Sequence, residues 1–281
     1  NAIMIGYWKE FFYDPSNPAT DIFLIDYVTW MAYAYPMFLL QLPMVTIVLF
    51  MTFKPEYSDL SRAVTKLRMQ VMLEGPLKPA DWVAILIFLL VLFGWITQSQ
   101  QLGMGIIAVL GAACFLIAGL VRWEDINSGV NWGVVWLYAA AISLGVQMKD
   151  TGGAEWVAEN FLALLSPLGA DQGIGLWAAV SGLTTIVTNT MSNGAAVAVL
   201  GPIVLKMASV AGESPIIIGF ITAVSSAFAY LTVVGTPACT IVYASGYLKA
   251  TDFLNVGTRM VAVSIIIMLG AAWVYWPLIG A

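Results

Sequence analysis

The chain has 281 residues, of which 60% are hydrophobic and only 10% are charged, with 11 basic and 16 acidic side chains. Soluble globular domains carry about 25% charged residues, so this composition excludes an ordinary soluble domain and indicates a helical membrane protein. The sequence contains no histidine, which excludes histidine–metal sites, haem ligation and histidine-activated nucleophiles. Cys114 and Cys239 form no metal motif, and no basic tract suggests a nucleic acid partner.

The N-terminal part is predicted to hold one long membrane helix and one polar loop. Residues 1–7 have the pattern of a helix end, and residues 21–53 form an apolar segment that Pro36 and Pro43 are expected to kink. Residues 54–81 are the only long polar stretch and hold five of the eleven basic residues. The positive-inside rule therefore predicts that this loop is cytoplasmic.

Three further membrane segments are predicted at 82–97, 104–121 and 132–148, because each is apolar over much of the length needed to cross a bilayer. Residues 154–170 have the pattern of an amphipathic helix that lies near the membrane interface. No acidic residue falls in the interior of a predicted span, so an intramembrane aspartyl protease is excluded and no enzymatic activity is expected.

Residues 172–205 carry no charge, yet they do not have the pattern of one spanning helix. The apolar parts 174–187 and 194–205 are each too short, at 1.5 Å per residue, for the roughly 30 Å of the hydrocarbon core. A polar cluster, 188–193, separates them. Two half-length helices that meet at a polar tip predict a re-entrant hairpin, which is tolerated only where protein buries it or where it lines a cavity.

Residues 215–248 form a second charge-free segment that is too long for a simple span. Gly235, Thr236 and Pro237 interrupt it, because glycine relaxes the backbone and proline removes a hydrogen-bond donor. We therefore predict a broken helix in two halves.

The last span is predicted at 256–279. Arg259 near its start and the aromatic rings of Trp273 and Trp276 near its other end fit the inner and outer edges of a membrane. Counting crossings from the cytoplasmic loop gives the same orientation, with the C-terminus outside.

The two interrupted helices are where a binding site is expected. The N-terminal ends of half-helices offer free N–H groups to an anion, and unwound carbonyl groups can hold a cation. The candidate residues are Ser192, Asn193, Gly194, Gly235, Thr236 and Pro237. The alternative that remains open is a pair of ordinary helices with polar side chains packed between them.

Three motifs resemble the divalent anion/sodium symporter family. Its Ser-Asn-Thr signature is similar to residues 188–202, TNTMSNGAAVAVLGP. Its broken-helix motif is similar to residues 233–249, VVGTPACTIVYASGYLK, and its helix that begins with Asp-Trp-Gly is similar to residues 131–157. The resemblance covers the second half of such a transporter, and residues 1–7 also echo residues 239–247, which suggests inverted repeats.

The resemblance implies an all-α inverted-repeat secondary transporter with a re-entrant hairpin and a broken transmembrane helix. It implies elevator motion, in which 1–53, the end of the first repeat, and 171–281 form the transport domain, while 54–170 form the cytoplasmic loop and scaffold. It further implies a homodimer in a lipid bilayer, a missing first repeat as partner, and a bacterial inner membrane as location.

The implied function is sodium-coupled transport of di- or tricarboxylates or sulfate-like anions. Ser192 and Asn193 would bind an oxyanion of the substrate, with Thr236 and Pro237 on the opposite wall. Gly194 stands where the family has threonine, which predicts a wider pocket with one donor fewer. An anion channel and a non-transporting membrane subunit are the alternatives.

The resemblance also implies one sodium ion as the coupling ion. Thr188, Met191, Asn193 and Gly235 would supply its oxygen ligands, largely from backbone carbonyls, as hard cations prefer.

Overall fold

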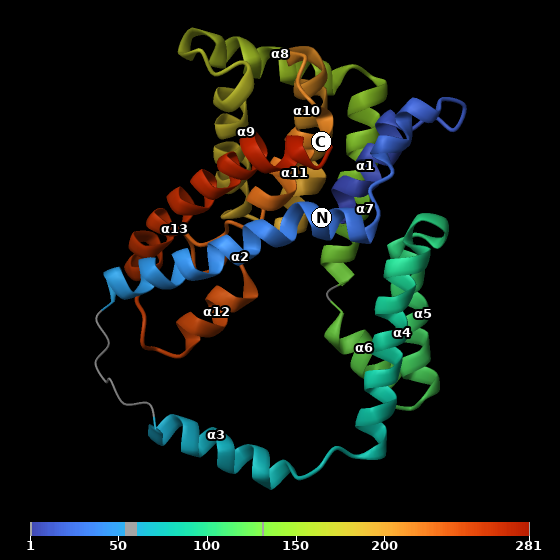
Figure 1. Ribbon diagram of the computed structural model, residues 1–281, viewed down its shortest axis with the longest axis vertical. Helices are drawn as coiled ribbons and strands as arrows, with labels where there is room; N and C mark the ends of the chain where they lie inside the picture. The colour runs from blue at the N-terminus through green and yellow to red at the C-terminus, as the bar shows by residue number, and fades with distance from the viewer. Residues whose placement is uncertain (1, 54–60, 131, 281) are drawn as a thin grey trace. The chain divides into compact units, whose positions relative to one another are not determined.

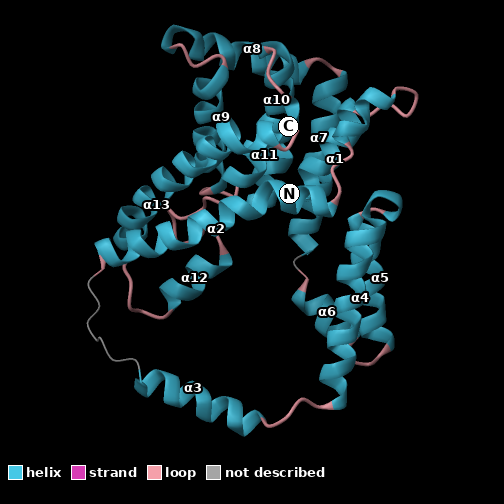
Figure 2. Cartoon of the chain, viewed as in Figure 1, coloured by secondary structure: helices cyan, strands magenta, loops and turns pink. Residues whose placement is uncertain are grey.

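A computed structural model describes residues 2–53, 61–130 and 132–280, and all regular elements of these residues are helices (Figures 1 and 2). The α-helices are α1 Ala2–Phe12, α2 Tyr27–Thr52, α3 Ser61–Glu74, α4 Pro79–Leu102, α5 Met104–Ile117, α6 Trp123–Gly129, α7 Trp132–Asp150, α8 Gly153–Leu165, α9 Gly173–Thr188, α10 Asn193–Ala211, α11 Pro215–Ser225, α12 Pro237–Ala244, α13 Ala250–Gly270 and α14 Trp276–Leu278. The predicted all-α fold is confirmed. The first part of the polar loop, 54–60, and the end residues of two resembling segments, Asn1 and Asn131, lie outside the described residues.

Four helical stretches of the described residues are long and apolar enough to cross a membrane: α2, α4, α10 and Ala250–Leu278. The segment predicted at 104–121 is shorter in the structure, because α5 ends at Ile117 and Gly119 follows with φ +66°. Glycine takes this left-handed conformation without a Cβ penalty and commonly ends a helix. The polar loop holds α3, which the sequence pattern did not predict.

The chain divides into two compact units, which we describe separately. The smaller unit comprises 26–28 and 50–131, and α4 packs on α5 at its centre. Gly111 lies against the Val91 side chain, where a Cβ would collide. Small residues of this kind allow helix backbones to approach closely in membrane proteins.

The larger unit comprises 1–25, 29–49 and 132–281. Its core is an aromatic cluster around Phe220 of α11, whose ring centroid lies 4.5–5.5 Å from those of Trp8, Trp30, Tyr33 and Trp276. Trp276 is fully buried, and its indole N–H donates to the Tyr33 carbonyl at 3.1 Å. The prediction that Trp276 is an interfacial anchor is therefore wrong, whereas Trp273 is 66% exposed.

Two prolines remain inside helices because tyrosines replace the bonds that they remove. Proline frees the carbonyl four residues earlier in a helix. In α10, Pro202 frees the Ala198 carbonyl, which accepts a bond from Tyr7 Oη at 2.7 Å. In α2, Pro36 frees the carbonyl of Ala32, and Tyr275 Oη donates to it at 2.9 Å.

Helices α9 and α10 form a helical hairpin over the predicted residues, but the prediction that both arms are too short to span a membrane is wrong for α10, which is long and apolar enough to cross one. It continues past residue 205 to Ala211, where Gly212 ends it in a left-handed conformation. At the open end of the hairpin, the Glu213 carboxylate accepts bonds from the Gly173 N–H at 2.7 Å and the Trp177 indole at 3.1 Å. The negative side chain thus caps the positive end of α9 and ties the two arms together.

Helices α7 and α8 lie in the same compact unit as the hairpin and pack against α10. A Cβ on Gly145 of α7 would stand 2.5 Å from Pro202 Cγ, so the absence of a side chain at Gly145 lets α7 approach α10 closely. Helix α8 is amphipathic, as predicted: Ala154, Ala158 and Leu162 are buried, whereas Trp156 is 67% exposed.

Candidate functional site

The tip of the hairpin is a short non-helical link between α9 and α10. Ser192 is the N-cap of α10, and its hydroxyl accepts a hydrogen bond from the Ala195 N–H at 3.3 Å. The helix therefore begins as predicted, with Asn193 and Gly194 in its first turn, where backbone N–H groups have no partner within the helix. Met191 precedes the cap and is 38% exposed.

Thr188 joins the tip to the segment that follows α11. Its buried hydroxyl lies 2.6 Å from the Ser226 carbonyl oxygen and 3.0 Å from Asn193 Oδ1, both acceptors. The structure thus places Thr188 and Asn193, which the resemblance names as two ligands of one ion, within hydrogen-bond distance of each other. It adds the carbonyl of Ser226, which the sequence analysis did not single out.

Asn189 holds the tip on the broken helix. The side chain is 4% exposed, and its amide group donates to the carbonyls of Thr185 at 2.8 Å and Phe228 at 3.1 Å. Its Oδ1 accepts from the Leu231 N–H at 2.8 Å, and its backbone carbonyl accepts from Thr232 Oγ1 at 2.9 Å. The only sequence signal for this role is the position of Asn189 within the polar cluster.

The break between α11 and α12 begins at Ser226, earlier than the 234–237 that the sequence predicted. The amide of Asn189 pairs with backbone groups of residues 228 and 231, so these two groups have hydrogen-bond partners although the segment has left the helix. The break is therefore set by a long-range partner as well as by the local Gly-Thr-Pro sequence.

The far side of the break starts α12. Thr236 is its N-cap and accepts from the Cys239 N–H at 3.2 Å, and Pro237 takes the first helical position. Gly235 packs against Ala229, whose carbonyl oxygen would lie 2.9 Å from an added Cβ. In the described residues, the hydrogen bonds that link residues 226–232 to the tip come from Thr188 and Asn189 rather than from Ser192 or Asn193.

The space beside Gly194 is filled by Tyr138 of α7. An added Cβ at Gly194 would stand 2.6 Å from Tyr138 Cζ, and the tyrosine hydroxyl lies 3.3 Å from Ser192 Oγ. The expectation of a wider pocket with one donor fewer is therefore wrong, because Tyr138 brings a hydroxyl to the position that lacks a side chain. A tyrosine in an apolar helix gave no sequence signal of this contact.

The polar groups of this region are all neutral. Residues 172–205 and 215–248 contain no charged side chain. No group of three or more acidic or cysteine side chains that could hold a metal occurs in the part of the chain that the structure describes. The oxygens available are threonine hydroxyls, an asparagine amide and backbone carbonyls, which suit a hard cation of low charge.

Apolar helices long enough to span a membrane, a hairpin with a polar tip and a helix broken beside it are the elements with which polytopic secondary transporters build their binding sites. Residues 19–281 match the model of the family described as the sodium:sulfate symporter transmembrane region. The chain belongs to this family, which confirms the resemblance seen in its motifs.

Three relatives illustrate the similarity. The chain is 23% identical over 268 residues to an uncharacterized transporter of Haemophilus influenzae, covering 90% of this chain and 56% of the relative. It is 25% identical over 324 residues to sodium-dependent high-affinity dicarboxylate transporter 3 of Caenorhabditis elegans, covering 99% and 54%. It is 24% identical over 267 residues to the sodium-dependent dicarboxylate transporter SdcS of Staphylococcus saprophyticus, covering 87% and 50%. The chain thus spans about half the length of the curated relatives that it matches.

Proposed function

We propose that the protein takes part in the sodium-coupled secondary transport of small anions, either di- or tricarboxylates or sulfate-like oxyanions. Family membership supports transport across a membrane. The names of two relatives, both sodium-dependent dicarboxylate transporters, support the ion and the class of anion.

The observation that carries this proposal is the neutral, oxygen-lined contact between Thr188, Asn193 and the Ser226 carbonyl. Burying an anion with no counter-charge is costly, and these segments supply no cationic side chain. A sodium ion bound beside the anion would provide that charge. Each ion would then favour binding of the other, which is the thermodynamic basis of coupling.

We assign the anion to Ser192, Asn193 and the first-turn N–H groups at Gly194, with Thr236 and Pro237 opposite. Helix N-termini bind anions through such N–H groups. The Tyr138 hydroxyl, which lies 3.3 Å from Ser192 Oγ, joins this wall.

We assign the sodium ion to Thr188, Met191, Asn193 and Gly235. The contact between Thr188 and Asn193 supports this set, because Thr188 Oγ1 and Asn193 Oδ1 lie 3.0 Å apart and one sodium ion would contact both. The carbonyl of Ser226 extends it.

The proposal includes elevator motion, in which 1–53 and 171–281 move against 54–170. It also includes a homodimer, a further repeat from outside these residues, a cytoplasmic loop at 54–81, an external C-terminus and an inner-membrane location. The polar contacts between α7 or α8 and α10, such as Tyr138 with Ser192, are of a kind that such motion can break.

The test is uptake of labelled sulfate and labelled succinate by proteoliposomes that contain the purified full-length protein. We expect saturable uptake that needs an inward sodium gradient and fails when potassium replaces sodium. Sodium-independent, non-saturable flux would favour an anion channel. No flux, together with no thermal stabilisation by any anion, would favour a non-transporting subunit.

A further inference from the structure

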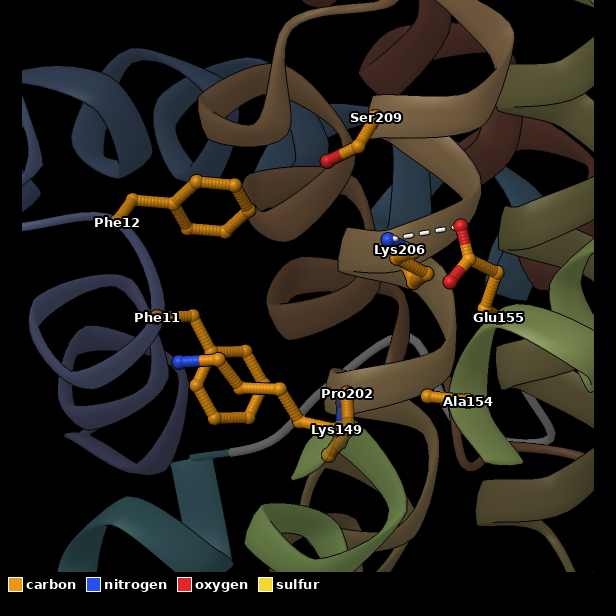
Figure 3. Close-up of a pocket in the computed structure, with 8 residues that line it drawn as sticks. All are labelled: Phe11, Phe12, Lys149, Ala154, Glu155, Pro202, Lys206 and Ser209. Atoms are coloured by element: carbon orange, nitrogen blue, oxygen red, sulfur yellow. Dashed lines mark ion pairs between the residues drawn. The ribbon is translucent and has the colours of Figure 1, made fainter. Parts of the chain in front are cut away.

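A cavity lined by both charged and apolar side chains lies among α1, α7, α8 and α10 of the larger unit, away from the hairpin tip. Figure 3 shows the residues that line it: Phe11, Phe12, Lys149, Ala154, Glu155, Pro202, Lys206 and Ser209. Its volume is about 140 Å³. About 10–15 Å³ of such volume holds one water molecule, so the cavity has room for several, and therefore for a group the size of a phosphate.

The cavity carries more positive than negative charge. Two lysines and one carboxylate line it, and the Lys206 ammonium lies 3.1 Å from Glu155 Oε1. Lys149 has different partners: its ammonium lies 4.6 Å from the centre of the Phe11 ring and donates to the Glu10 carbonyl at 3.3 Å. Because Glu155 neutralises only Lys206, one net positive charge remains among the side chains that line the cavity.

The ion pair does not close the cavity. The side chains of Lys206 and Glu155 are 38% and 47% exposed, and exposed pairs of this kind are weak. Lys206 can therefore exchange its partner for a ligand that brings a full negative charge. Ser209 adds a hydroxyl to the same wall.

The surroundings indicate where such a ligand comes from. Helix α8, which supplies Ala154 and Glu155, buries one face in the protein and exposes Trp156 and Leu164 on the other. An amphipathic helix with an exposed tryptophan is typical of the membrane interface. Phospholipid phosphates lie at this depth, and Phe11 and Phe12 offer an apolar wall to the rest of a lipid.

We propose that Lys149 and Lys206 bind a phosphate group in this cavity, supplied by the headgroup of an anionic phospholipid of the surrounding bilayer. Lysine binds phosphate as a point charge, and basic pockets between membrane helices bind anionic headgroups. This site is separate from the hairpin tip and does not depend on the transport proposal.

The test is native mass spectrometry of the purified protein with phosphatidylglycerol, phosphatidylcholine or inorganic phosphate added. We expect one phosphatidylglycerol to be retained in preference to phosphatidylcholine. Lys149→Gln and Lys206→Gln should each weaken that binding by at least about tenfold, because each removes a charge-assisted contact. Lys9→Gln is the matched control, since Lys9 lies on α1, is exposed and does not line the cavity.

Glu155→Gln separates this role from a purely structural ion pair. Removing the carboxylate should tighten lipid binding several-fold, opposite in sign to Lys206→Gln. A structural pair predicts instead that both variants lower the melting temperature alike and leave lipid binding unchanged, which would overturn the proposal. Displacement of the lipid by millimolar inorganic phosphate, or equal retention of both lipids, would also overturn the assignment to an anionic headgroup.

Discussion

The fit between Gly194 and Tyr138 gives the sharpest prediction from the hairpin tip. Gly194→Ala adds one methyl group at a place where Tyr138 Cζ would lie 2.6 Å away and Cε1 3.2 Å away. Neither separation is a normal van der Waals contact. The tyrosine ring must therefore move, and its contact with Ser192 Oγ is lost.

The magnitude follows from the two effects together. Overpacking of this kind costs about 1–3 kcal/mol, and the lost neutral hydrogen bond adds about 0.5–1.5 kcal/mol. Alanine in place of glycine in a helix gains up to about 1 kcal/mol. We therefore expect Gly194→Ala to lower the free energy of unfolding by about 0.5–4.5 kcal/mol.

The assay is a double-mutant cycle with Tyr138→Ala, measured by chemical denaturation in detergent. In the Tyr138→Ala background the three atoms nearest to the added methyl are gone, so Gly194→Ala should be neutral or stabilising. The coupling energy should be about 1–3 kcal/mol, within the range for residues in direct contact. An equal cost of Gly194→Ala in both backgrounds would refute the close packing of Tyr138 on Gly194. Gly194→Thr should weaken binding of all anions in the native background, because its larger side chain meets the same Tyr138 ring.

Three further predictions concern Asn189, Glu213 and Asp14. Asn189→Leu should lower the free energy of unfolding by about 3 kcal/mol or more, because it leaves buried backbone groups unpaired; a loss no larger than that of exposed Thr190→Ala would contradict this. Glu213→Gln should cost about 1–2 kcal/mol, because the charge-assisted bonds at the hairpin base become neutral; an unchanged melting temperature would count against that clamp. Hydrogen bonds from the Ser16 hydroxyl and N–H lower the pKa of the Asp14 carboxyl. The stability that these bonds add is therefore present at pH values above the ordinary pKa of the carboxyl, and it is lost as the pH falls through the lowered pKa. Ser16→Ala should raise that pKa in an NMR titration, and no change would show that the hydroxyl is not a donor.

The sequence predicted the features that local chemistry determines. Helix α9 ends at Thr188 and α10 begins at Asn193, where neutral polar residues replace an apolar run. Thr236 and Pro237 start α12 for the same local reasons, a side-chain cap followed by proline at the first position.

What the sequence could not predict depends on contacts between distant residues. Asn189 sets the start of the break by bonding to residues 39 to 42 positions later, and no local pattern carries that information. Tyr138 reaches Ser192 across 54 residues. The burial of Trp276 also depends on a distant residue, because its indole donates to the Tyr33 carbonyl. Its position near a helix end alone predicted an interfacial tryptophan.

The central claim is that one neutral site holds both a sodium ion and an anion, with Asn193 common to both. The most direct measurement is the affinity of the purified full-length protein for a dicarboxylate over a range of sodium concentrations, for the native protein and for Asn193→Ala. Matched melting temperatures without ligand would establish that the variant is folded. We predict that the affinity of the native protein rises with sodium, whereas that of the variant is weak and independent of sodium. Unchanged sodium dependence in Asn193→Ala would contradict the claim.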